Sequence, residues 1–162
     1  MNDFYTEQLV KRKTTGKVML AKAGLIILTL VSLILLLKTP FALILTMVLI
    51  ALDIFLFRNM DLEYEYLFVN GELDVDKIIA RSKRKKVFSA NVEELELLAP
   101  TGSSELRLVQ AEKTYNYSSM AEGRKTYELI VSQKGQKIKV IFEPNDTILN
   151  GFKTLAPRKV II

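Results

Sequence analysis

The stretch that decides the fold is VMLAKAGLIILTLVSLILLLKTPFALILTMVLIALDIFLF, which runs from Val18 to Phe57. Two apolar runs meet at Lys38-Thr39-Pro40, and each run holds one charged residue. Because an α-helix rises about 1.5 Å per residue, roughly twenty residues cross a hydrocarbon core of about 30 Å. The sequence therefore predicts a transmembrane helical hairpin over residues 18–57, with spans at 18–37 and 40–57.

Lipid is a better solvent for these runs than a protein core. Both are apolar on all sides, and a chain of 162 residues has no other apolar mass to cover them. A cleavable signal peptide is disfavoured because the first run is too long and no A-x-A-like site follows it. Four basic residues precede the first run and Arg58 follows the second, whereas the turn carries Lys38 alone. The positive-inside rule then predicts a multi-pass protein of the cell membrane with both termini in the cytoplasm.

The two charged residues inside the runs are Lys22 and Asp53. Counted from the turn, they fall at similar depth, near the cytoplasmic surface. In one interpretation each side chain reaches the headgroup region separately, Asp53 beside Arg58; in another the two form an intramembrane pair across the hairpin. An ion or proton pathway is disfavoured, because a single Lys and a single Asp at a membrane edge make a poor path.

Composition excludes several classes of function. The net charge of +5 is concentrated near the membrane: the first 22 residues carry five Lys or Arg against two acidic residues, whereas residues 61–162 carry sixteen against fifteen. A nearly neutral domain lacks the broad positive field that nucleic acids require, so we expect no nucleic-acid partner. The chain has no Cys and no His, which removes disulfides, thiolate chemistry and His-based catalysis or metal ligation. We therefore expect no catalytic residues, no metal site and no cofactor.

Residues 1–17 form a short basic segment that is predicted to lie in the cytoplasm. Phe4, Tyr5, Leu9 and Val10 recur at a helix-like spacing, and the basic triplet 11–13 follows them. One interpretation is an amphipathic turn on the anionic inner leaflet, with headgroup contacts from Lys11, Arg12 and Lys13. The other is a frayed tail that only sets the topology.

After Phe57 the sequence changes to an alternation of period two. Acidic residues alternate with apolar or aromatic ones over 61–69 and again over 72–76, on either side of Asn70-Gly71. Asn-Gly between alternating runs is the strongest short-range signal for a β-hairpin. A two-residue loop sets the register, which pairs Phe68 with Leu73, Tyr66 with Val75 and Tyr64 with Lys77.

The second face of this hairpin is acidic. It carries Glu63, Glu65, Glu72, Asp74 and Asp76. Glu65 lies opposite Asp76, and like charges across a strand pair are mildly destabilising. The first interpretation is a fully solvated face. Two alternatives are pairing with the basic residues that follow in the chain and binding of a divalent cation, although the spacing resembles no EF-hand.

A basic run follows the hairpin within about 25 residues of the membrane. It consists of Arg81, Lys83, Arg84, Lys85 and Lys86. Near a membrane surface, each such residue attracts anionic headgroups by about 1 kcal/mol. We hypothesise a lipid-facing role; the alternatives are a solvated connection between strands and a site for a phosphate-bearing ligand.

The remaining residues predict short strands and one helix. Strands are expected at 87–90, 95–98, 105–111, 113–117, 124–133 and 136–142, arranged as a meander. Apolar residues at a 3–4 spacing then predict a helix over about 145–156, which Asn145 or Asp146 would cap and Pro157 would end. Residues 61–162 thus form an α+β domain of six or seven antiparallel strands, a sheet or barrel closed by a C-terminal helix.

This arrangement resembles the pleckstrin-homology-like (PH-like) domains that bacteria attach to pairs of membrane spans. The combination of EQLVKRK, the two apolar runs and NGELDVDKIIARSKRKKV over 70–87 is similar to an uncharacterised family of small two-span bacterial membrane proteins. The resemblance covers nearly the whole chain. It implies a PH-like fold on the cytoplasmic side, but it supplies no binding or catalytic residues, because a fold does not fix a function.

The function we expect is a membrane-anchored, non-enzymatic adaptor. Its partners would be the lipid bilayer and either another protein or a second copy of the chain. The alternative is a module that senses anionic lipids through residues 81–86 and the basic N-terminal segment. Salt distinguishes the two, because headgroup binding weakens steeply with ionic strength while an apolar interface does not.

Overall fold

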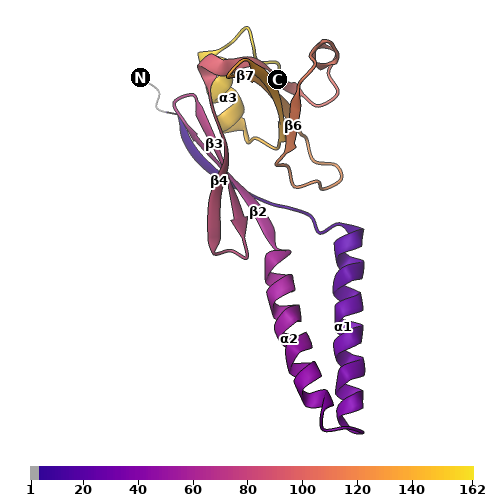
Figure 1. The fold of residues 1–162 in the computed structure, drawn as a ribbon. Coiled ribbons are helices and arrows are strands. Elements are labelled where there is room, and N and C mark those ends of the chain that lie inside the picture. The colour runs from indigo at the N-terminus through magenta and orange to yellow at the C-terminus, as the bar shows by residue number, and fades with distance from the viewer. Residues whose placement is uncertain (1–3) are drawn as a thin grey trace.

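The computed structural model describes residues 4–162, which form an α+β domain joined to a pair of long antiparallel helices (Figure 1). The domain contains two four-stranded sheets and the C-terminal helix α3. The helices α1 (Gly16–Leu36) and α2 (Ala42–Asn59) extend away from it as a hairpin. The architecture thus agrees with the expected PH-like domain and with the expected pair of N-terminal helices.

Helix α1 is long and apolar enough to cross a membrane, and it is the one helix of residues 4–162 that meets this test of length and composition. Only 6% of its most apolar stretch is buried. Helix α2 is shorter and ends in Arg58-Asn59. Ser32 and Thr46 are buried and donate hydrogen bonds to carbonyls of their own helices, at 2.7 and 2.9 Å. One of the two helices could thus span a membrane by length and composition, and the two-span prediction is not confirmed.

Lys22 and Asp53 do not contact each other in the structure, and each has another partner. Thr29 Oγ1 donates a hydrogen bond of 2.6 Å to Asp53 Oδ2, and Lys22 Nζ lies 5.5 Å from the centre of the Phe57 ring. Among the described residues, no carboxylate lies within ion-pair distance of Lys22, and Arg58 does not pair with Asp53 either. Asp53 has Thr29 of the facing helix as its hydrogen-bond partner, and the predicted intramembrane pair is not formed.

The N-terminal segment is a β-strand, so both predictions for it are wrong over the described residues; residues 1–3 lie outside them. Strand β1 (Tyr5–Lys11) pairs antiparallel with β2 (Leu62–Val69), from Tyr5 opposite Val69 to Lys11 opposite Glu63. The inward positions are Thr6, Gln8 and Val10, and of these Val10 alone is apolar. The alternation was therefore too weak to predict a strand. The helical hairpin is inserted in the connection between β1 and β2.

The first sheet has the order β1-β2-β3-β4, with β3 at Glu72–Ile79 and β4 at Lys83–Asn91. The predicted register is confirmed: Phe68 lies opposite Leu73, Tyr66 opposite Val75 and Tyr64 opposite Lys77. Asn70 and Gly71 have φ values of 46° and 96°, as a type I′ hairpin turn requires. The inward side chains of this hairpin, Tyr66, Phe68, Leu73 and Val75, are fully buried.

The second sheet is not a simple meander. Its order is β5-β7-β8-β6, with bounds Leu95–Pro100, Tyr127–Gln133, Gln136–Phe142 and Lys113–Asn116. Strand β6 runs parallel to β8, whereas the other pairs are antiparallel. Residues 61–162 contain seven strands, β2 to β8, as predicted, and β1 from the N-terminal segment adds an eighth.

The strand predicted at 105–111 is a 3-10 helix over Glu105–Leu108. Leu106 is buried against Ala99 and Ile130, but Leu108, two residues later, is 89% exposed. A half-buried strand would bury both residues. The spacing of two was therefore coincidental, and this segment instead carries the chain from the end of β5 to the start of β6.

Helix α3 (Asp146–Leu155) confirms the predicted C-terminal helix. The Asn145 side chain accepts a hydrogen bond of 2.9 Å from Ile148 N and so caps the helix. Ile148, Leu149 and Phe152 are buried in the main core, between the residues of the two sheets. The helix thus closes the domain, as the spacing of its apolar residues indicated.

Candidate membrane-facing surface

Two short connections join the helices to the domain. Residues 12–15 lead from β1 into α1, and residues 60–61 lead from α2 into β2. Because β1 and β2 are neighbours in one sheet, both connections leave the same end of that sheet (Figure 1). This end carries the candidate surface.

Asp61 connects the two linkers to the turn between β3 and β4. Its carboxylate lies 3.3 Å from Lys11 Nζ and 3.5 Å from Arg81 Nε, and its backbone oxygen accepts a hydrogen bond of 3.0 Å from Ala80 N. The three side chains are 32 to 70% exposed, so each ion pair alone contributes little stability. Together they hold the β3-β4 turn beside the start of β2.

Arg12 and Lys13 also bind within the protein. Arg12 Nη1 donates a hydrogen bond of 2.7 Å to the Tyr64 hydroxyl, and the guanidinium lies 5.8 Å from the centre of that ring. Lys13 N donates to Ser119 O at 2.7 Å, and its ammonium lies 3.8 Å from Glu122. The three N-terminal basic residues predicted to contact headgroups therefore all have partners in the domain, and they fasten the linker to it.

The β3-β4 turn lies beside the last turn of α2. A cavity of about 280 Å³ separates them, lined by Phe55 and Arg58 of α2 and by Ala80, Ser82 and Lys83 of the turn. Figure 1 shows the β3-β4 hairpin extending past the rest of the domain toward the helices. Ala80 and Arg81 have φ values of 53° and 54°, so the turn is tight. The predicted basic run therefore lies at the helix end of the molecule.

The basic run continues into β4 and divides between the two faces of the sheet. On the outer face, Arg84 contacts Glu65 at 2.6 Å and Asp76 at 3.8 Å, and Lys86 Nζ lies 2.5 Å from Asp74. The hydrogen bond to Asp74 raises the pKa of Lys86 above its ordinary value. The acidic face is therefore not fully solvated. Its carboxylates pair with the basic run, which was one of the two alternatives.

Three lysines lie on the opposite face, and we call them the lysine face: Lys77, Lys83 and Lys85. Lys77 lies opposite Lys85 in the register of β3 and β4. Along the same face, the neighbouring opposed residues are the core residues Val75 and Phe88. Within residues 4–162, no carboxylate lies within 4.0 Å of any of the three. Their charges therefore remain available to an external anion.

Aromatic residues border the lysine face where the core ends. Tyr64 packs on Tyr117 with ring centres 5.2 Å apart, and Tyr115 stacks on Tyr117 at 5.9 Å. Burial, with smaller contributions from Tyr115 and Tyr64, raises the pKa of Tyr117 to about 12. Burial likewise raises the pKa of Tyr66, whose hydroxyl donates a 2.7 Å hydrogen bond to Tyr117 O. These hydroxyls stay protonated at neutral pH.

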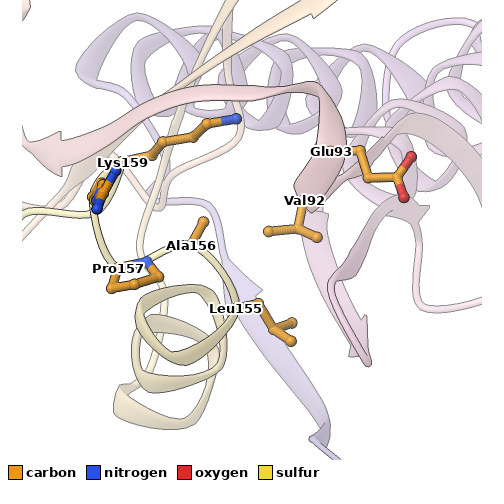
Figure 2. A pocket seen from close by; sticks show the side chains of 7 residues that line it. Val92, Glu93, Leu155, Ala156, Pro157 and Lys159 are labelled. Atoms are coloured by element: carbon orange, nitrogen blue, oxygen red, sulfur yellow. The ribbon is translucent and has the colours of Figure 1, made fainter.

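A second cavity, of about 380 Å³, lies at the other end of the first sheet. Val92, Leu155, Ala156 and Pro157 line it together with Glu93 and Lys159, and Figure 2 shows Val92 and Leu155 near one another, with Ala156 and Pro157 to their left. It adjoins the β2-β3 turn, because a Cβ atom on Gly71 would lie 2.9 Å from Leu155 Cδ1. This turn is the end of the hairpin farthest from the helices, so the cavity lies at the end of the sheet away from them.

Sequence reasoning missed Lys77 as a site residue. Its signal was present, since Leu73, Val75 and Lys77 share one side of β3 and a charged residue ends an apolar series. Sequence reasoning also missed Glu143, which is buried although it is acidic. Its position directly before Pro144 at the end of a strand gave no indication of burial.

Two sheets closed by a C-terminal helix define a PH-like domain, here with a helical hairpin in its β1-β2 connection. The chain belongs to the family described as Bacterial PH-like domain (DUF6106), whose model matches residues 2–162. Searches of the curated proteins and of the solved structures gave no match. The resemblance to a bacterial PH-like family is thus confirmed.

Proposed function

We propose that α1 and α2 both cross the membrane and hold the PH-like domain at the cytoplasmic leaflet. The observation that supports this topology is the pairing of β1 with β2 over seven residues on either side of the helices. A single crossing by α1 would leave these two strands on opposite sides of the bilayer. If α1 crosses, α2 must therefore cross back. Lys17 and Arg58, at the outer helix ends, favour the cytoplasmic side.

We further propose that the lysine face contacts anionic headgroups. The geometry that supports this role is the position of the β3-β4 turn beside the last turn of α2. Lys83 and Lys85 are exposed there and have no carboxylate partner among residues 4–162. Near an anionic leaflet each lysine contributes about 1 kcal/mol of attraction. Arg84 and Lys86 contribute less in this proposal, because they are paired on the outer face.

The test uses a single-cysteine label, because the chain has no cysteine of its own. Ser82→Cys in the β3-β4 turn carries an environment-sensitive dye, with the full chain in nanodiscs of increasing anionic lipid content. We expect the dye signal to change with anionic lipid and to return to baseline at high salt, since screening shortens the Debye length from ~10 Å at 0.1 M to ~3 Å at 1 M. A label at Lys134, in the β7-β8 turn, should not respond.

The matched variants separate a local contact from net charge. Changing Lys77, Lys83 and Lys85 to Gln should remove the response of the Ser82→Cys label. Changing Lys113, Lys125 and Lys134 to Gln removes the same charge elsewhere and should leave the response intact. Equal loss in both variants would show a nonspecific charge effect, and no loss in the first would refute the proposed contact.

A second candidate function is the adaptor role, which the apolar cavity at the end of α3 favours. Leu155 is 44% exposed and lines this cavity, which lies at the end of the sheet away from the helices. The proposed role is binding of a cytoplasmic protein, with no catalysis by the chain. A partner recovered with the full chain in mild detergent should be lost with Leu155→Gln and retained with Leu108→Gln, an equally apolar but separate exposed site. A partner that both variants retain would exclude this cavity.

A further inference from the structure

We propose that a cavity between β1 and the loop over 118–124 binds a small zwitterion, whose primary ammonium group meets the buried carboxylate of Glu143. The cavity has a volume of about 240 Å³. It is lined by Gln8, Leu9, Val10, Lys11, Ser119, Ala121, Arg124 and Glu143. Because drug-sized sites measure about 300–1000 Å³, this one suits a smaller group.

Glu143 is the residue that requires an explanation. It is 9% exposed, and its Oε1 accepts hydrogen bonds from Ser119 N at 2.8 Å and Ser119 Oγ at 2.6 Å. Within residues 4–162, its Oε2 has no hydrogen-bond donor and no Lys or Arg nitrogen within 4.0 Å. Oε2 is not one of the fully buried side-chain oxygens, so it is reached from the cavity that Glu143 lines. A cation in the cavity would complete its coordination.

The surroundings indicate which cation fits. No group of three His, Cys, Asp or Glu side chains suited to a metal ion occurs in the described part of the chain. A primary ammonium carries three N–H donors and needs only one carboxylate with accepting neighbours. Oε2 of Glu143 supplies the carboxylate oxygen, and Gln8 and Ser119 line the same cavity.

Arg124 supplies the site for an anion on the same ligand. It lines the cavity and has no carboxylate within ion-pair distance among residues 4–162, whereas Lys11 is already paired with Asp61. A guanidinium binds phosphate or carboxylate through two parallel hydrogen bonds. The ligand class is therefore an ammonium joined by a short linker to an anion, as in phosphoethanolamine.

Such a group has two sources, a phosphatidylethanolamine headgroup or a free zwitterion. Lys11 precedes the start of α1 at Gly16 by five residues, so the cavity lies at the helix end of the domain. Binding of a free compound does not depend on the proposed membrane topology, and only the lipid source does. Neither source uses the lysine face, so this proposal and the proposed headgroup contact fail separately.

The first experiment measures binding of O-phosphoethanolamine to the full chain in a maltoside detergent by ligand-observed NMR. Phosphocholine is the control, because its trimethylammonium group has no N–H donor, and it should bind about tenfold more weakly or worse. Inorganic phosphate alone should also bind more weakly. Equal binding of phosphoethanolamine and phosphocholine would overturn the proposal, as would equal binding of inorganic phosphate.

The variants test the two halves of the site. Glu143→Gln and Arg124→Gln should each weaken phosphoethanolamine binding about tenfold, since each removes a charged hydrogen-bond partner. The matched controls Glu122→Gln and Lys125→Gln change neighbouring exposed residues and should bind like the wild type. Should Glu143→Gln unfold the domain, Arg124→Gln carries the test, because Arg124 is exposed and its replacement leaves the core unchanged. Wild-type binding in Arg124→Gln, or in a folded Glu143→Gln, contradicts the assignment.

The second experiment identifies the source. Nanodiscs of phosphatidylethanolamine and of phosphatidylcholine with equal anionic content are compared by hydrogen exchange at Ser119 and Ala121. Slower exchange with phosphatidylethanolamine, lost in Glu143→Gln, assigns the lipid headgroup. Equal exchange in both nanodiscs, with the free compound bound, assigns a soluble zwitterion. Equal exchange with no binding of the free compound refutes the site.

Discussion

Replacing Gly151 with Ala tests the packing of α3 on the first sheet. A Cβ atom at this position would lie 2.3 Å from Phe68 Cε1 and 2.9 Å from Phe68 Cζ. Phe68 is fully buried, and its ring centre lies 4.8 Å from that of Phe152, so the ring cannot move into solvent. Glycine at 151 therefore permits the close approach of α3 to β2.

Two effects of opposite sign decide the result. Ala in place of Gly within a helix stabilises it by about 1 kcal/mol. Overpacking a full core costs about 1–3 kcal/mol, and a contact of 2.3 Å with a buried ring belongs at the upper end of this range. We expect a net loss of about 2 kcal/mol in the free energy of unfolding, which lowers the unfolding temperature of a chain of this size by about 4–8 °C.

The measurement is urea unfolding of the full chain in detergent, followed by tyrosine fluorescence, since the chain has six Tyr and no Trp. Thr154→Ala is the matched control, because Thr154 is exposed on the same helix and its replacement gives only the gain in helix propensity. Phe68→Leu should reduce the penalty of Gly151→Ala in a double-mutant cycle. A Gly151→Ala variant as stable as Thr154→Ala would refute the packing argument.

Two further predictions concern the core and its helix cap. Asn145→Ala should lower the free energy of unfolding by about 1 kcal/mol, because it removes the hydrogen bond that Ile148 N donates to the Asn145 side chain. Urea unfolding measures this loss. The control is Asn150→Ala in the exposed middle of α3, which removes no cap and should not show the loss. Because the pKa of Tyr117 is raised from 10.0 to about 12, the folded state holds this proton more tightly, so its contribution to stability is complete below pH 10 and is lost as the pH rises toward 12. The free energy of unfolding, measured across this pH range, should fall less steeply in Tyr117→Phe than in the wild type. Equal slopes in the two proteins would contradict the raised pKa of Tyr117 as the cause.

The parts of the fold that could be predicted from sequence are those specified locally. Asn70-Gly71 fixed a turn type, and the turn type fixed the register of β2 and β3 residue by residue. The C-terminal helix was likewise predictable, because its apolar stripe and its cap lie within a dozen residues. In both cases the determining interactions are short in sequence.

The parts that could not be predicted depend on distant partners. Strand β1 has one buried apolar residue, and its partner β2 begins about fifty residues later, so no local pattern reveals the pair. The role of Arg84 and Lys86 depended on which face of β4 each occupies, and a shift of register between Val75 and Asp76 alters this. Glu143 is buried through contacts with Gln8, Tyr66 and Ser119, which three separate segments supply.

The insertion of the helices between two neighbouring strands bears on how a lipid contact would gain affinity. Packed helices lie about 8–10 Å apart and paired strands about 4.8 Å apart, so connections of four and two residues suffice to join them and leave little freedom. The Asp61 ion pairs and the contacts of Arg12 and Lys13 reduce that freedom further. Binding normally loses free energy to the ordering of the partners. If the helices anchor the domain as proposed, most of that ordering precedes the contact, and the proposed lysine face of three residues would then need little further affinity to respond to the charge of the leaflet.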